Sequence, residues 1–299
     1  MVNRADLTDG LERCLAAIVS RSGGTLGAGL RYTENGQSIP VGEGLWATAD
    51  RIGPYRHIIA DADSGQAACF ATLTEGRTRS IMALRIAMSG SAVTEMEAVI
   101  ARPPLGGGAD SFGDGASQLD RADGPDPAWL APVPEEERVS RAELRRVADM
   151  YFAGLEQNDG RGDYPFAEDC IRIENGFRTT SLPLEESAAG ETPYVAAFRA
   201  LGAKEQFESG FFRFVSRIRD RRYPVIDTER GVVFAFAFFD HFGTLRDYAL
   251  ADGTPVKEAI DRPFTWMIAE AFRIEGGLLR RIEALMLPVP YGMAPGWPG

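Results

Sequence analysis

The sequence predicts an α+β protein of two tandem, cone-shaped barrel modules, each built from N-terminal helices packed on a curved antiparallel sheet. Three observations predict it: a length of 299 residues, a central stretch rich in Gly, Pro and Asp, and matching segments on both sides of that stretch. A chain of this length is long enough for two domains that each bury a core of their own.

The central stretch, 103–138, is the expected domain boundary. It holds eight acidic residues against two arginines, and it shows neither a helical nor an alternating apolar pattern. We therefore expect a disordered acidic linker there, with one module over 1–102 and another over 139–299. The second module carries an insertion at 178–215, whose FESGFFRFV run is a candidate lid helix.

Each module is expected to open with a capped amphipathic helix. In the first module, Asp9 and Glu12 form a capping pair beside apolar residues at helical spacing. In the second, Ser140 and Glu143 repeat this arrangement. The same local pattern at both starts is the first indication of an internal repeat.

The strand segments that follow also repeat in the same order. Asp61 corresponds to Asp227, and Glu97 corresponds to Glu283. Four matches in register favour duplication over chance similarity. The matched segments are LRYTENG at 30–36 with CIRIENG at 170–176, residues 55–73 with 221–239, and residues 81–104 with 265–290.

Three runs of the second half carry a family resemblance: FTWMIAEAFRIEGGLLRRIEALMLPVPYGMAPGW, CIRIENG and VFAFAFFDH. They resemble the nuclear transport factor two-like, or SnoaL-like, superfamily, whose fold hosts many unrelated activities. Two-module chains of this kind are similar to cofactor-independent lyases that remove formaldehyde from lignin-derived diarylpropanes and give stilbenes. This resemblance implies a pocket for two aromatic rings, a general base, and cationic or phenolic groups that bind a phenolate.

The two histidines are the side chains best suited to exchange protons near neutral pH. His57 begins an apolar strand four residues before Asp61. His241 ends the strand VVFAFAFFDH on the face of Ala235 and Ala237, whose small side chains leave room beside a pocket rim. A structural role for His57 and an exposed strand-end position for His241 are the alternatives.

Charged side chains within apolar strands complete the candidate site. Arg85 interrupts IMALRIAM and must reach solvent or meet an anion or phenolate. Glu97 and Glu283 are candidate bases in an apolar cone, or a polar support that both modules share. Arg172 and Glu174 lie on one face of CIRIENG, which meets either a polar cavity or solvent.

Two sets of residues form the candidate site. The predicted catalytic residues are His57, Asp61, Arg85, Glu97 and Tyr32. The predicted substrate-binding residues are Tyr55, Trp46, Arg172 and His241.

Composition excludes several classes of partner. The net charge is −11, and no Lys/Arg cluster of the kind that binds phosphates is visible, which argues against nucleic acid and anionic membrane. Nucleotide-binding glycine loops, serine nucleophile elbows and zinc motifs are missing from the sequence, so we expect no cofactor and no metal. Without a signal peptide or an apolar run of about 20 residues, a cytoplasmic location is expected.

The leading hypothesis is a cofactor-independent carbon–carbon lyase acting on a hydrophobic aromatic small molecule. A dehydratase or isomerase of a hydrophobic molecule is the second hypothesis. The third is not enzymatic: one module binds a ligand while the other serves as an internal dimer partner. Homo-oligomerisation of the whole chain is left open.

Overall fold

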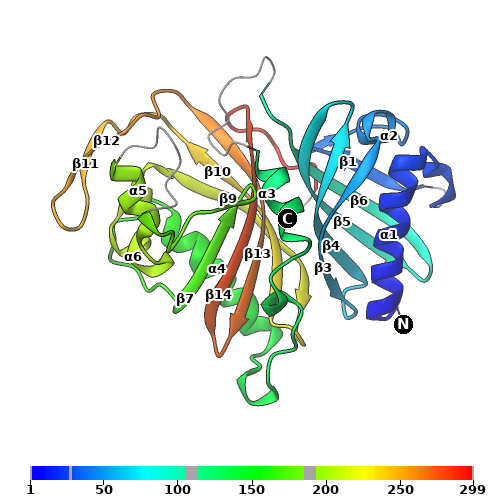
Figure 1. The fold of residues 1–299 in the computed structure, drawn as a ribbon, viewed down its shortest axis with the longest axis horizontal. Helices are drawn as coiled ribbons and strands as arrows, with labels where there is room; N and C mark the ends of the chain where they lie inside the picture. Colours follow the sequence, from blue (N-terminus) through cyan, green and yellow to red (C-terminus); the bar gives the residue numbers. More distant parts are fainter. Residues whose placement is uncertain (1, 27–28, 105–113, 185–192, 298–299) are drawn as a thin grey trace.

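The computed structural model describes residues 2–26, 29–104, 114–184 and 193–297. These ranges form two modules of one design, each a six-stranded sheet with a long helix on its outer face (Figure 1). The predicted mixed α+β architecture is therefore confirmed. Among the described strands each sheet keeps two free edges, so closure into a barrel is not seen.

The first module begins with helix α1 (Arg4–Ser20) and includes the short helix α2 (Leu45–Thr48). Its sheet has the strand order β2-β1-β6-β5-β4-β3. The strands are β1 (Arg31–Glu34), β2 (Gln37–Ser38), β3 (Arg51–Asp61), β4 (Gln66–Glu75), β5 (Thr78–Ser89) and β6 (Ala92–Ala101).

The second module begins with helix α4 (Arg141–Leu155), and its sheet has the order β8-β7-β14-β13-β10-β9. The strands are β7 (Phe166–Glu174), β8 (Phe177–Arg178), β9 (Arg217–Asp227), β10 (Val232–His241), β13 (Phe264–Glu275) and β14 (Leu278–Val289). A separate hairpin consists of β11 (Asp247–Ala249) and β12 (Pro255–Lys257).

The two sheets have equivalent strand orders. Glu97 lies opposite Arg85 in the β5–β6 pair, and Glu283 lies opposite Ala271 in the β13–β14 pair. One feature differs from the predicted antiparallel sheet: β1 pairs with β6 in parallel, and β7 pairs with β14 in parallel.

The helix starts follow local capping chemistry. Ser140 accepts a hydrogen bond from the Glu143 backbone N–H at the start of α4, as predicted. In the first module the prediction is wrong, because Asn3 and Asp6 form the capping box and Asp9 lies inside α1.

The described part of the acidic stretch is ordered rather than a disordered linker. It contains helix α3 (Gly115–Ala122) and 3-10 turns at Pro127–Trp129 and Glu135–Glu137. Trp129 and Val133 are buried there. Apolar residues of this segment, including Trp129, pack into the core between the two sheets. Residues 105–113 of the predicted linker lie outside the described ranges.

The insertion of the second module folds over its outer face. It contains α5 (Pro193–Ala200), α6 (Ala203–Glu208) and a 3-10 turn at Phe211–Phe214. The FESGFFRFV run is therefore the end of α6 plus this turn, not one lid helix. Its phenylalanines pack on one another, with the rings of Phe198 and Phe211 only 4.1 Å apart.

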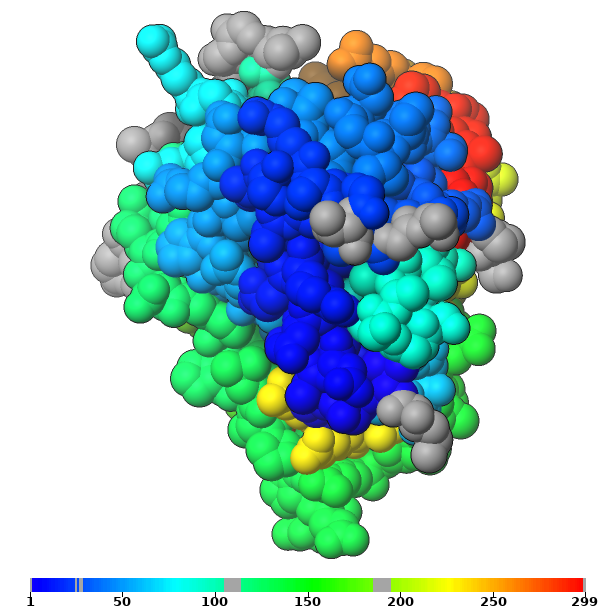
Figure 2. Space-filling view, turned by 90° about the vertical axis from the view of Figure 1, so that its right-hand side faces the viewer, coloured from blue at the N-terminus to red at the C-terminus, as the bar shows by residue number. Residues whose placement is uncertain are grey.

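The two sheets face each other across a shared apolar core. Phe70 of β4 and Phe234 of β10 meet in it with ring centroids 5.5 Å apart. Ion pairs at the edges are reciprocal: Arg141, the first residue of α4, lies 2.6 Å from Asp61, and Arg4, the first residue of α1, lies 2.6 Å from Asp227. Figure 2 shows the N-terminal end of α1 (blue) beside the second module (yellow). The modules thus pair like the halves of a twofold dimer.

Candidate active site

A cavity of about 250 Å³ lies on the outer, concave face of the second module's sheet. Helix α4, the sheet and the insertion enclose it. Its lining is mostly apolar and aromatic, with a few polar groups, which is the usual character of a small-molecule site. The polar lining residues are Tyr151, Arg172, Glu174, Thr179, Arg199, His241 and Glu270.

Strand alternation directs these polar side chains into the cavity. Glu270 of β13 lies opposite Ala235 of β10 and Ala284 of β14, so an alanine stands on each side of it on the same face. The small neighbours leave the space that Glu270 and the cavity occupy. Arg172 and Glu174 alternate on the adjoining strand β7, so both also reach the cavity.

Glu270 is a strongly perturbed group of the cavity. Its side chain is buried, and burial raises the pKa of Glu270 to about 8, with a further increase from the nearby Glu174 charge. A hydrogen bond from Tyr151 and the charge of Arg172 act in the opposite direction but do not cancel the effect. At neutral pH Glu270 is therefore mainly a neutral carboxylic acid that can donate a proton.

Arg172 is only 1% exposed, and two of its three guanidinium nitrogens are hydrogen-bonded. Its Nη2 donates to Gln206 at 2.6 Å, and its Nε donates to the Thr179 hydroxyl at 3.2 Å. Its Nη1 has no hydrogen-bond partner among the described residues. An unpaired buried N–H group is costly, so Arg172 offers a ready donor to an oxygen of a bound molecule.

His241 forms part of the aromatic wall. Its ring stacks on Phe264 with centroids 4.4 Å apart and planes at 3°, and Phe214 lies on it at 5.8 Å. Burial lowers the pKa of His241 to about 4, outweighing the opposing effects of the Phe239 carbonyl and Asp240. The imidazole is therefore neutral at physiological pH and acts as a flat, weakly polar surface.

A family model described as a domain of unknown function, DUF8021, matches residues 137–286. The chain belongs to this family. The match runs from just before α4 into β14, so the DUF8021 domain contains the cavity and all its polar groups. No curated protein matches the chain.

Two solved structures are similar to parts of the chain. One is a de novo designed protein with a curved β-sheet, with 8% identity and a TM-score of 0.28 over 33% of this chain and 88% of the other. The second is an NTF2-like protein from Anabaena variabilis ATCC 29413, with 12% identity and a TM-score of 0.27 over 50% of this chain and 93% of the other.

The first module differs from the DUF8021 domain at two of these cavity positions, although Glu34, opposite Ala98, stands where Glu174 lies opposite Ala284. The position equivalent to Glu270, between Cys69 and Ala98 in the sheet register, is Leu84. Tyr32 occupies the position equivalent to Arg172. Tyr32 lies opposite Met96 of β6, and Arg172 lies opposite Ile282, the equivalent residue of β14. The corresponding face of the first sheet packs against α1, Leu45 and Trp46 in a hydrophobic core. Two of the polar groups that line the cavity of the second module, Glu270 and Arg172, are thus replaced by Leu84 and Tyr32 in the first.

Four predicted catalytic residues lie at the junction of the modules, away from the cavity. Asp61 pairs with Arg141 as described above, and Arg85 pairs with Glu97 at 3.2 Å. Glu97 also binds Arg222 of β9. His57 Nδ1 lies 2.6 Å from Glu283 in the other sheet. These charges satisfy one another, so they are positioned to join the modules.

The other predicted residues divide between the two modules. Tyr55 donates a hydrogen bond to Glu283 at 2.9 Å across the junction. Tyr32 donates to Glu34 at 2.9 Å inside the first core, where Trp46 is also buried. Only Arg172 and His241 of the predicted set line the cavity.

Glu270 and Tyr151 were not predicted as site residues. A signal for Glu270 exists in the sequence, because it interrupts the apolar run FTWMIAEAF as Arg85 interrupts IMALRIAM. Tyr151 looks like an ordinary member of the apolar stripe of α4. Only the fold reveals that its hydroxyl meets a buried carboxyl group.

Within the described ranges, no helix is both long and apolar enough to cross a membrane. Groups of three or more His, Cys, Asp or Glu side chains with metal-binding geometry are not found in those ranges.

Proposed function

We propose that the DUF8021 domain of this chain is an acid–base enzyme that acts on an apolar small molecule. Glu270 transfers the proton, Tyr151 orients the Glu270 carboxyl group, and Arg172 binds the oxygen on which negative charge develops. The observation that carries this proposal is the neutral, buried Glu270 in an aromatic cavity that also contains a guanidinium with an unpaired N–H. A strongly shifted group in a cavity is a common mark of a catalytic site.

Elimination of water is the reaction class that these groups support best. In its neutral form Glu270 protonates a leaving hydroxyl group, and the C–O bond breaks as water departs. The resulting carboxylate then takes a proton from the substrate, which restores the acid. Arg172 stabilises a carbonyl or phenolate oxygen that is conjugated with the reacting carbon atoms.

A finer form of this proposal is the formaldehyde-releasing lyase that the family resemblance implies. A diarylpropane diol, bound as its phenolate beside Arg172, first loses its benzylic hydroxyl as water after protonation by Glu270, and becomes a neutral quinone methide. The Glu270 carboxylate then takes the proton of the terminal hydroxyl, the adjacent C–C bond breaks, and formaldehyde and a stilbene form. Atoms and electrons balance without an oxidant. The aromatic walls around His241 support this form.

The first module fits a structural role in this proposal. The face of its sheet that carries α1 is a hydrophobic core, and its other face packs on the second sheet. It is therefore proposed as the internal partner that stabilises the DUF8021 domain, which combines the enzymatic hypothesis with the dimer-partner hypothesis.

The test is an assay with a diarylpropane diol, following formaldehyde and the near-ultraviolet absorbance of a stilbene. We expect turnover in the wild type and its loss in Glu270→Gln. The matched control is Glu168→Gln, which changes an exposed glutamate on strand β7 of the same module. Water loss without formaldehyde would leave a dehydratase and refute the lyase form. Binding without any conversion would refute the enzymatic proposal.

A further inference from the structure

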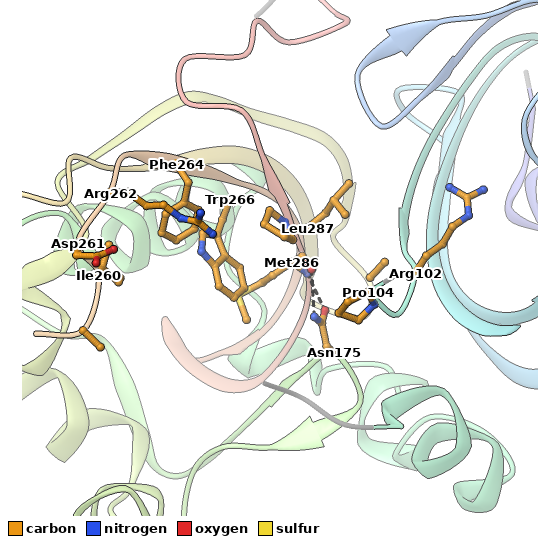
Figure 3. Close-up of a pocket in the computed structure, with 13 residues that line it drawn as sticks. Arg102, Pro104, Asn175, Ile260, Asp261, Arg262, Phe264, Trp266, Met286 and Leu287 are labelled. Carbon is orange, nitrogen blue, oxygen red and sulfur yellow. Dashed lines mark hydrogen bonds between the residues drawn. The ribbon is translucent and has the colours of Figure 1, made fainter. Parts of the chain in front are cut away.

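A second hollow adjoins the cavity and reaches the first module. This groove of about 810 Å³ shares three lining residues with the cavity, namely Ile260, Trp266 and Met286. From there it passes Leu287 and reaches Pro104, which follows strand β6 (Figure 3). Ala101, the last residue of β6, lines the same end of the groove. Cavity and groove are therefore neighbouring parts of one hollow, and the two modules form opposite ends of it.

The volumes indicate that the cavity alone is small for a substrate. Sites for drug-sized ligands measure roughly 300–1,000 Å³, and the cavity measures about 250 Å³. A molecule with its reactive end beside Glu270 and further bulk can extend past Trp266. The groove is the adjoining space that shares a wall with the cavity.

The chemistry of the groove favours an apolar, uncharged occupant. Phe264, Trp266 and Leu287 provide aromatic and aliphatic surface. The guanidinium of Arg102 is already paired with Glu34 at 2.8 Å and Glu75 at 2.7 Å.

Two charged residues remain at the other end of the groove. Asp261 and Arg262 are neighbours in the chain and carry opposite charges, so the groove has no net charge that would select an ion.

We propose that the groove binds the distal part of the substrate, which is an elongated, uncharged molecule with an apolar second half. The first module is then a wall of the binding site, and Ala101 and Pro104 are specificity-determining residues for substrate length. This inference rests on the proposed function, because it places the reactive half of the same molecule in the cavity.

The test compares two probes by titration calorimetry: phenol, which fits the cavity, and trans-4-hydroxystilbene, which extends into the groove. We expect the stilbene to bind at least tenfold more tightly than phenol. Ala101→Glu puts a charge at the apolar end of the groove and should abolish this advantage without changing the affinity for phenol. The matched control is Ala92→Glu, an exposed position at the other end of β6, which should leave both affinities unchanged.

The outcomes separate this inference from the proposed function. Phenol binding without any gain for the stilbene, or a gain that survives Ala101→Glu, overturns the inference alone. Failure of both probes to bind overturns the proposed site as well. If Ala101→Glu no longer binds phenol, Pro104→Glu replaces it, because Pro104 is exposed and lies outside the sheet. A stilbene advantage that persists in that variant overturns the inference.

Discussion

The Nδ1 atom of His57 lies 2.6 Å from the carboxylate of Glu283, across the junction of the two sheets. At the equivalent place in the other module, Arg222 binds Glu97. The sheet registers match, because His57 lies opposite Phe70 and Arg222 lies opposite Phe236. The junction therefore repeats one cross-module pair twice, with a histidine on one side and an arginine on the other.

His57→Ala should destabilise the protein without changing the chemistry of the folded enzyme. Loss of one partner leaves the buried Glu283 with Tyr55 alone, at a cost of about 3 kcal/mol in the free energy of unfolding. Urea unfolding measures the loss, and kcat is compared on the folded protein. His57→Asn keeps an N–H donor near this place and should recover part of the stability. A folded His57→Ala variant with a strongly reduced kcat would contradict the structural role.

Glu270 should make the protein less stable as the pH rises. Its pKa is about 8 in the folded protein against an ordinary value of 4.5, so between these values the folded state holds a proton that the unfolded chain has lost. Stability is fully present below about pH 4.5 and falls up to about pH 8. The difference in free energy of unfolding between Glu270→Gln and the wild type should shift in favour of the variant by on the order of 3 to 5 kcal/mol as the pH rises from 5 to 9. An unchanged difference across that range would contradict the shift.

The same group sets the expected pH dependence of turnover. Elimination begins with the neutral form of Glu270, so kcat should fall as the pH rises through about 8. Glu270→Gln should lower kcat by roughly 10²–10⁴-fold and remove this limb. A rate that instead rises through pH 8 would indicate that the carboxylate starts the reaction, as in an isomerase.

His241 should destabilise the protein in mild acid. Its pKa is lowered to about 4 from 6.5, so below pH 6.5 the unfolded chain binds a proton that the folded protein does not. The stability that depends on the neutral ring is present above pH 6.5 and is lost as the pH falls towards 4. The wild type should lose about 3 kcal/mol more free energy of unfolding than His241→Phe when the pH is lowered from 7 to 4, as measured by unfolding experiments at both pH values. Parallel pH profiles for the two proteins would refute the assignment.

Local patterns in the sequence account for much of the fold. Asn35-Gly36 and Asn175-Gly176 mark equivalent turns, and Ser140 marks the start of α4. The order of the acidic stretch could not be predicted in this way. Its single buried tryptophan, Trp129, packs on a surface that exists only once the sheets have met, with its ring 4.5 Å from that of His57.

The candidate site was predictable only in part, for a related reason. Arg172 and His241 are recognisable as polar residues on strand faces with room beside them. Alternation alone does not say whether such a face meets a cavity or the other module. Glu270 faces the cavity, whereas Glu97 and Glu283 face the other module. Sheet-to-sheet packing, which no local pattern encodes, decides it.

The state of Glu270 at neutral pH is the central claim, and it can be measured directly. Carbon-13 NMR of protein labelled at the glutamate side-chain carboxyl carbons, with the Glu270 signal assigned through Glu270→Gln, follows this group through a pH titration. We predict a midpoint of about 8. A midpoint near the ordinary glutamate value of 4.5 would mean that Glu270 is ionised at neutral pH, and it would contradict the proposed acid catalysis.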